Sequence, residues 1–90
     1  MPLFALICTD KPDHQPVRAA NRDAHLAYLR TGTAVSQAGP FLDGSGGMRG
    51  SLVVLDLPDH AAAADWAAAD PYALAGLFAD VRIEEWRKVI

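Results

Sequence analysis

Short stretches of alternating or continuous apolar residues mark four candidate β-strands along the chain. Residues 2–9 and 51–57 are mostly apolar at successive positions, so both faces of each strand carry apolar side chains. Within residues 34–41, the pair Gly39-Pro40 requires a bend or an edge position, because proline cannot donate a hydrogen bond to a neighbouring strand. Residues 81–90 read as a strand in which each face carries both apolar and charged side chains. We therefore expect four strands, two of them apolar on both sides.

Two further stretches have the spacing of helices. The first begins at Pro16 or Val17, carries a stripe of apolar side chains and runs through Thr31, just before Gly32. The second runs from about residue 60 to residue 69 and is rich in alanine. Together the elements follow the order β-α-β-β-α-β. We predict an α+β, ferredoxin-like fold with a four-stranded antiparallel sheet and both helices on one face.

The helical pattern breaks at Asp70-Pro71, near the C-terminal end. Proline cannot continue a helix as an interior residue, and the residue before it is pushed toward extended dihedral angles. Asp70 is therefore a suitable N-cap for a short helix that starts at Pro71, and Gly76 suits its end. The pattern alone leaves open whether Asp70 is only a cap or also has a chemical partner.

Both predicted helices cover the same face of the sheet, so the other face is left bare. The strands at residues 2–9 and 51–57 are apolar on that bare face as well. Soluble monomers rarely expose a large apolar surface, and a small domain buries only a modest fraction of its surface. We expect the bare face to pack on a second copy as a homodimer, with a higher oligomer left open.

Composition narrows the class of protein. The chain has 90 residues, enough for one domain over residues 1–90, and its 51% hydrophobic and 21% charged residues are typical of globular proteins. The net charge is -3 and the Lys and Arg residues are scattered, which argues against binding to nucleic acid. No apolar run is long enough to span a membrane, and the N-terminus lacks a signal-peptide pattern. The single Cys8 cannot form an internal disulfide, so we expect a cytoplasmic protein in which Cys8 is a core residue.

His25 is the first candidate for chemistry. It lies at the edge of the apolar stripe of the first helix, and Arg22 and Leu29 project from the same side. A histidine ring can take or give a proton near neutral pH, and a carboxylate bonded to its other nitrogen fixes the tautomer. The predicted fold places the first helix beside the end of the second, where Asp70 lies. His25 and Asp70 form a candidate acid/base pair; the alternative is a histidine at the rim of the core.

The Gly-rich stretch over residues 42–50 is the second candidate. It joins two strands and lacks the glycine-lysine pattern of a phosphate-binding loop, which also needs a helix N-terminus. We predict a flexible hairpin loop that can serve as a lid over a small pocket. Asp43 and Ser51 flank this loop and could bind a ligand, although both are common turn residues.

The remaining histidines and the tryptophans favour structural roles. His14 and His60 have no second metal ligand at a standard spacing, so we predict solvent-facing histidines and no metal site. Trp66 and Trp86 are expected to pack between helix and sheet.

Several blocks of the chain together resemble the YciI-like family. In the family's order, these blocks are Arg22 to Leu29, Ala38 to Asp43, Gly50 to Leu52, Asp70 to Phe78, and Trp86. The resemblance implies a ferredoxin-like domain that dimerises through its sheets as a dimeric α/β-barrel. It also implies a pocket in which the catalytic positions fall on His25 and Asp70. The family's Gly-Pro and Gly-Ser positions fall on Gly39, Pro40, Gly50 and Ser51. We expect the substrate to be bound by Arg22, Gly39, Pro40, Ser51 and Tyr72.

The resemblance also suggests a type of reaction. The family includes a dehydrochlorinase that acts on a chlorinated hydroxyquinol, and more distant barrel relatives include muconolactone isomerase. Both move protons on small ring compounds without an organic cofactor. We therefore expect a cofactor-free isomerase, lyase or dehydrochlorinase acting on a small aromatic or lactone-like molecule, with His25 as acid/base and Asp70 orienting it. The alternative is a non-catalytic small-molecule-binding or accessory protein that uses the same pocket.

Overall fold

The computed structural model describes residues 2–90 and has the predicted ferredoxin-like order, including the short helix predicted to start at Pro71. The elements are β1 (Leu3–Asp10), α1 (Gln15–Leu29), β2 (Val35–Leu42), β3 (Met48–Asp56), α2 (His60–Ala68), α3 (Pro71–Leu74) and β4 (Phe78–Trp86).

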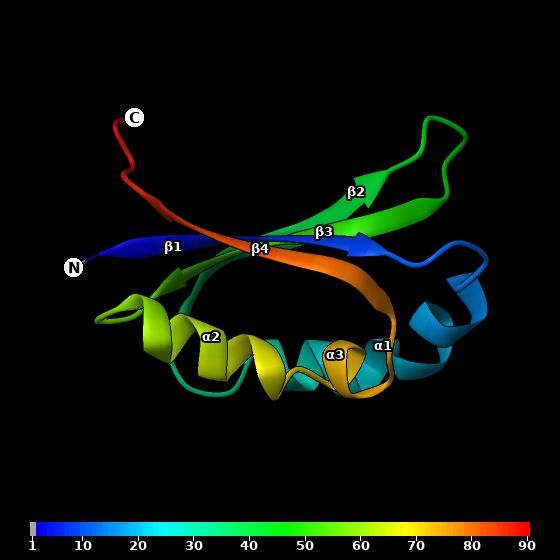
Figure 1. Ribbon diagram of the computed structural model, residues 1–90, viewed down its shortest axis with the longest axis horizontal. Helices are drawn as coiled ribbons and strands as arrows, with labels where there is room; N and C mark the ends of the chain where they lie inside the picture. The colour runs from blue at the N-terminus through cyan, green and yellow to red at the C-terminus, as the bar shows by residue number, and fades with distance from the viewer. Residues whose placement is uncertain (1) are drawn as a thin grey trace.

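The strands form one antiparallel sheet in the order β2-β3-β1-β4. The helices lie in a layer against one face of this sheet, and no described element covers the other face (Figure 1). β1 and β3, whose sequences are apolar on both sides, are the two central strands. The predicted α+β fold with a four-stranded antiparallel sheet is confirmed.

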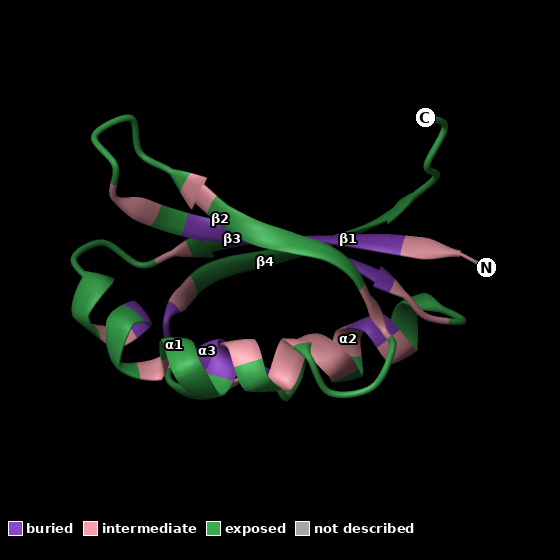
Figure 2. Cartoon of the chain, turned by 180° about the vertical axis from the view of Figure 1, so that it is seen from behind, coloured by how far each residue is buried: buried purple, intermediate pink, exposed green. Residues whose placement is uncertain are grey.

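The hydrophobic core lies between the central strands and the helices. Phe4, Leu6 and Cys8 project from β1 and pack with Val53 and Leu55 of β3. Buried residues are concentrated on these two strands and the facing sides of the helices, whereas β2 and β4 are mostly exposed (Figure 2). The prediction that Cys8 is a core residue is confirmed.

The loop between β2 and β3 is shorter than its glycine content indicated. Residues 43–47 form the loop, whereas Met48 to Gly50 belong to β3, contrary to the prediction. Gly50 lies opposite Thr9 in the sheet, and a Cβ atom at Gly50 would collide with the backbone carbonyl of Cys8. The glycine here permits a close approach between two strands instead of a flexible loop.

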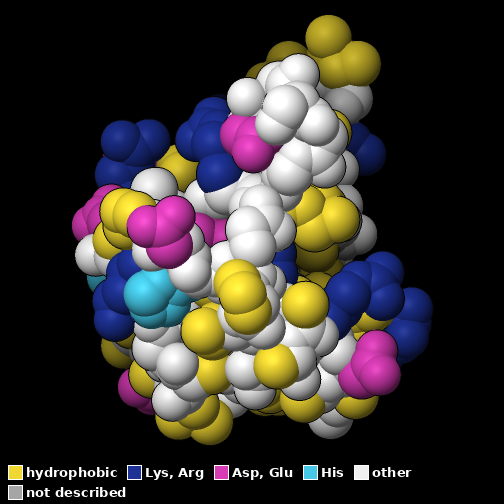
Figure 3. Space-filling view, turned by 90° about the vertical axis from the view of Figure 1, so that its right-hand side faces the viewer, with side chains coloured by type: hydrophobic (Ala, Val, Ile, Leu, Met, Phe, Trp, Pro, Cys, Tyr) yellow, Lys and Arg dark blue, Asp and Glu magenta, His cyan; other side chains and the backbone are white. Residues whose placement is uncertain are grey.

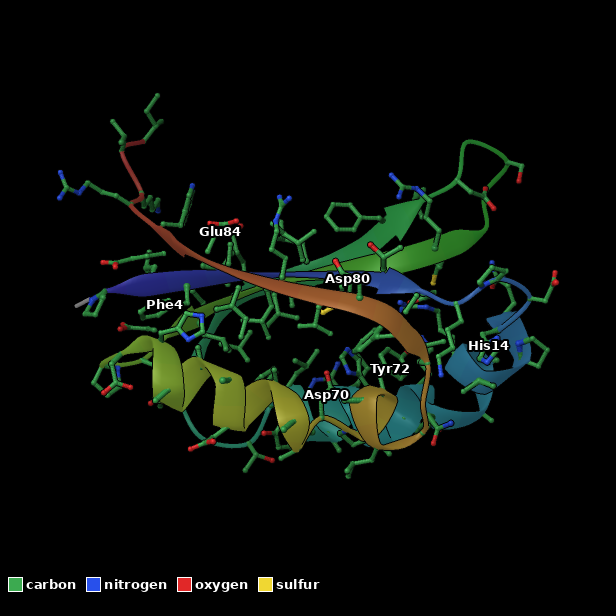
Figure 4. The ribbon with its side chains drawn as sticks, in the orientation of Figure 1. Phe4, His14, Asp70, Tyr72, Asp80 and Glu84 are labelled. Carbon is green, nitrogen blue, oxygen red and sulfur yellow. The ribbon has the colours of Figure 1, made fainter. Side chains whose placement is uncertain are left out.

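The two tryptophans lie on opposite sides of the sheet. Trp66 of α2 packs against the core as predicted. Trp86 lies opposite Leu3, whose neighbour Phe4 points toward the helices (Figure 4). Because side chains alternate along a strand, Leu3 and Trp86 lie on the helix-free face, and Trp86 is 41% exposed. The prediction that Trp86 packs between helix and sheet was wrong.

The predicted N-cap Asp70 is confirmed, and Asp59 caps α2 in the same way. The carboxylate of Asp59 accepts a hydrogen bond of 2.8 Å from the backbone N–H of Ala62 at the start of α2. Asp70 accepts one of 2.9 Å from the N–H of Tyr72 at the start of α3. Gly76 then adopts a left-handed conformation, with φ of 75°, and the chain turns into β4.

Side chains of different kinds occupy different parts of the surface. In the end-on view of Figure 3, hydrophobic side chains gather over the helical layer, with Lys and Arg side chains on either side of them. None of the helices within residues 2–90 has the length and apolar composition needed to cross a membrane.

Candidate active site

A cavity of about 160 Å³ lies between the helical layer and the β2–β3 side of the sheet. Its polar wall comes mainly from α1 and the start of α3, and its apolar wall from α1, β2 and β3. The lining residues are Arg18, Arg22, His25, Leu26, Leu29, Ala38, Gly39, Pro40, Met48, Ser51, Val53 and Tyr72.

Helical periodicity places three basic side chains of α1 on the cavity. Arg18, Arg22 and His25 are four and three residues apart, so they project from one face of the helix. Arg18 and His25 are buried, whereas Arg22 is exposed. One helix face therefore supplies both guanidinium groups and the imidazole.

The imidazole of His25 and the carboxylate of Asp70 are in direct contact. His25 Nδ1 lies 2.7 Å from Asp70 Oδ1, and the two residues are only 5% and 3% exposed. The same oxygen accepts the N–H of Tyr72, so the cap that starts α3 also orients the carboxylate. With Nδ1 donating to Asp70, Nε2 is the acceptor of the neutral ring. Nε2 makes no hydrogen bond within residues 2–90. It is not fully buried, so solvent can reach it.

Tyr72 fixes the plane of the imidazole. Its ring stacks on that of His25, with 3.8 Å between centroids and 12° between planes. The guanidinium of Arg18 lies 4.8 Å from the centroid of the Tyr72 ring. Burial raises the pKa of the Tyr72 phenol, although the charges of Arg18 and Arg22 oppose this shift. Tyr72 points from α3 toward the sheet, and Asp70 lies beside it at the start of α3 (Figure 4).

A second buried pair borders the cavity beside the first. Arg18 donates two hydrogen bonds to the carboxylate of Asp10, at 2.8 and 2.9 Å, and a third to Ser51 Oγ at 3.0 Å. Burial opposes the charge of Arg18, but the hydrogen bonds and charge of Asp10 outweigh it and raise the pKa of Arg18. Arg18 therefore stays charged and holds the Ser51 hydroxyl in place.

The positions predicted as substrate-binding fall on the cavity. Arg22, Gly39, Pro40, Ser51 and Tyr72 all line it, together with His25, and Asp70 lies directly behind the imidazole. Sequence reasoning missed the pair of Asp10 and Arg18. The position of Arg18, one helical turn before Arg22, places it on the same side of α1 as Arg22, but no local pattern links Arg18 to Asp10.

Other candidate residues lie away from the cavity. Asp43 accepts hydrogen bonds from Ser45 and Gly47 inside the hairpin loop and does not line the cavity. These bonds lower the pKa of Asp43. His60 is exposed, with its ring edge-on to Phe4. No group of three His, Cys, Asp or Glu side chains suited to a metal ion occurs among the described residues.

Comparisons with known sequences point to one family. The family model described as "YCII-related domain" matches residues 2–87. An uncharacterised protein of Haemophilus influenzae is 36% identical over 95 residues, covering 96% of this chain and 97% of that protein. "Protein YciI" of Escherichia coli O6:H1 is 35% identical over 97 residues, covering 97% and 98% of the two chains.

A comparison with solved structures adds a protein of stated activity. The 5-chloro-2-hydroxyhydroquinone dehydrochlorinase of Burkholderia phenoliruptrix, solved in complex with 2,5-dihydroxybenzoquinone, is 30% identical. Its TM-score with this chain is 0.84, and the match covers 94% of this chain and 93% of the dehydrochlorinase. The fold is therefore shared over nearly the full length of both proteins.

Proposed function

We propose that this chain, which belongs to the YCII-related domain family, is an enzyme that moves protons on a small ring compound. In this proposal the His25–Asp70 pair is the acid/base group and the adjoining cavity binds the substrate. The observation that carries the proposal is the hydrogen bond of 2.7 Å between His25 Nδ1 and Asp70 beside an open cavity. A histidine that only completed the core would instead bond to the backbone beside a filled space.

The proposed reaction begins at Nε2 of His25. Because Asp70 accepts the proton on Nδ1, Nε2 can take a proton from an O–H or an acidic C–H of the bound ring. In an isomerisation the imidazolium returns this proton to another atom of the same molecule. In an elimination the ring loses chloride as well as the proton, and the proton on Nε2 passes to solvent. Asp70 stabilises the imidazolium in either case.

The remaining cavity residues would hold the ring. We assign substrate binding to Arg22, Gly39, Pro40, Ser51 and Tyr72, all of which line the cavity. The similarity to a dehydrochlorinase solved with a quinone ligand supports a small ring compound as substrate. That activity is an elimination, one of the two outcomes open to this site.

We also propose that the protein is a homodimer joined through the helix-free face of the sheet. Leu3, Ile7 and Leu52 are only partly buried on that face, and Trp86 is exposed beside them. Strand alternation places Asp56 there too, and its Oδ1 is buried without a hydrogen-bond partner among residues 2–90. A second copy would cover the apolar residues and could supply the missing donor.

Light scattering tests the dimer directly. The wild-type protein should give twice the chain mass of 9.6 kDa at micromolar concentration, and Ile7→Glu should give the monomer. A wild-type protein that is monomeric under these conditions would remove the dimer proposal.

A turnover assay tests the enzymatic proposal. Chlorinated hydroxyquinols, hydroxyquinols and unsaturated lactones are incubated in D2O, and chloride release and deuterium incorporation are followed. Wild type and the control His60→Ala should turn over at least one compound equally, and His25→Ala should be about a hundred- to ten-thousand-fold slower. Equal turnover by His25→Ala would overturn the role of His25. Binding without turnover across the panel would favour a binding protein.

A further inference from the structure

Arg22 brings a positive charge to the cavity wall. The charge of Arg18 is matched by Asp10, and His25 is paired with Asp70. Arg22 has no carboxylate partner within residues 2–90, and no acidic residue is among the lining residues. With the ring of His25 neutral, the charge of Asp70 offsets that of Arg22 over the site as a whole. Asp70 lies behind the imidazole, however, whereas Arg22 lines the cavity, so an anionic group of the ligand is favoured beside Arg22.

The hydrogen-bonding groups of the wall point to the same kind of ligand. Ser51 Oγ already accepts a hydrogen bond from Arg18, so its own O–H proton is free to be donated. Arg22 offers only donors. Nε2 of His25 is the proton acceptor on the cavity wall. The side chains of Arg22 and Ser51 on the same wall supply hydrogen-bond donors. Such a site suits a molecule that loses a proton to His25 and is left with a negatively charged oxygen.

The size and the apolar lining of the cavity suit a single ring. The volume is about 160 Å³, close to the roughly 150 Å³ of an engineered apolar cavity that holds one benzene molecule. Leu26, Leu29, Pro40, Met48 and Val53 supply apolar walls. The rings of His25 and Tyr72 form a flat stack at the polar end. A planar six-membered ring fits these surfaces, and a fused second ring would extend out of the open side of the cavity.

We propose that the cavity binds a single six-membered ring as its oxyanion, a phenolate or enolate. The charged oxygen receives a hydrogen bond from the Ser51 hydroxyl and the charge of Arg22. Arg18, held by Asp10, is a positioning residue that fixes Ser51 without touching the ligand. This inference rests on the proposed function, because the oxyanion is the form of substrate that His25 would leave after removing a proton.

The probe for this proposal is 4-nitrophenol, whose phenolate absorbs visible light and whose hydroxyl ionises near neutral pH. Binding to the wild-type protein should favour the phenolate, so the absorbance titration of the bound probe should move to lower pH by about one unit. Its neutral analogue 4-nitroanisole should bind at least about tenfold more weakly. 4-Nitro-1-naphthol, which adds a fused ring, should also bind more weakly at a pH where both probes are anions.

Paired variants identify the groups responsible. Arg22→Gln and Ser51→Ala should each weaken binding of the 4-nitrophenolate by about tenfold or more, because each removes a donor to a charged oxygen. Arg30→Gln and Ser36→Ala, which change exposed residues outside the cavity, should bind as the wild type does. Circular dichroism of every variant checks that the fold is retained.

One more variant separates this proposal from the proton-transfer proposal. His25→Gln lacks the base but keeps Arg22 and Ser51, so it should still bind 4-nitrophenolate while losing turnover. If the wild type binds the phenolate but turns over none of the ring compounds, the enzymatic proposal fails and the oxyanion proposal stands. Equal binding of 4-nitrophenol and 4-nitroanisole, or unchanged phenolate binding by Arg22→Gln and Ser51→Ala, would overturn the oxyanion proposal.

Discussion

The imidazole ring of His25 lies flat on the phenol ring of Tyr72, with 3.8 Å between their centroids. The edge of the same imidazole bonds to Asp70, two residues before Tyr72 in the chain. Two residues at the start of α3 therefore orient the imidazole of His25 on α1. Tyr72 sets the plane of the ring, and Asp70 sets its rotation within that plane. Both contacts leave Nε2 unoccupied beside the cavity.

The stack makes Tyr72→Leu and Tyr72→Phe behave differently. Tyr72→Phe keeps the ring on His25 and should change the free energy of unfolding by less than about 1 kcal/mol. Tyr72→Leu loses the stack and should cost about 1–2 kcal/mol more. Urea unfolding of both variants measures the difference, and equal losses would show that the stack contributes nothing.

Asp70 should contribute more to stability than an ordinary helix cap. Asp70→Ala removes the cap of α3 and leaves the buried Nδ1–H of His25 without its acceptor, at a combined cost of about 3 kcal/mol. The matched variant Asp59→Ala removes only the cap of α2 and should cost about 1 kcal/mol. Unfolding in urea compares the two. Similar losses would mean that the contact with His25 adds nothing to stability.

The buried pair of Asp10 and Arg18 should contribute more to stability than an exposed carboxylate in the same protein. Asp10→Asn leaves the charge of Arg18 buried and uncompensated, which should cost about 3 kcal/mol of unfolding free energy. Asp65→Asn removes an exposed carboxylate of α2 that makes no ion pair within residues 2–90, and it should cost less than about 1 kcal/mol. A small effect of Asp10→Asn, within error of that of Asp65→Asn, would contradict this assignment.

Cys8 should make stability depend on alkaline pH. Burial, with help from the charges of Asp70 and Asp10, raises the pKa of its thiol from 9.0 to about 12. Above the unfolded value only the unfolded state releases the proton, so stability is intact below about pH 9 and falls as pH rises toward 12.

The variant Cys8→Ala isolates this effect, because other alkaline titrations occur in both proteins. The free energy of unfolding of wild type minus that of Cys8→Ala should fall by about 1 kcal/mol between about pH 8 and about pH 10. Urea unfolding at the two pH values gives this difference, and the same value at both would mean that the thiol is not shielded from ionisation.

Sequence patterns predicted the fold and a part of the candidate site. The ferredoxin-like order followed from apolar periodicity, and Pro71 revealed the corner at which Asp70 caps a helix. Helical spacing placed His25 and Arg22 on one side of α1. These features depend on neighbours in the chain, which a sequence displays directly.

The features that were missed depend on residues far apart in the chain. The hydrogen bonds of Arg18 join it to Asp10 and Ser51, eight and thirty-three positions away, and no local pattern marks such a network. Gly50 resembled a loop glycine because the sequence does not show the carbonyl of Cys8 that faces it. Trp86 was misplaced because the alternating residues of β4 have mixed character on both faces, which does not identify the buried one.

The most direct test of the proposed acid/base role is the tautomer of His25, read from the nitrogen resonances of its ring by NMR. The hydrogen bond to Asp70 should place the proton of the neutral ring on Nδ1 and leave Nε2 bare. Asp70→Asn should weaken or reverse this preference, while His60 in the same spectrum should be unaffected. A wild-type ring protonated on Nε2 would contradict the proposal, because the nitrogen facing the cavity could not then accept a proton.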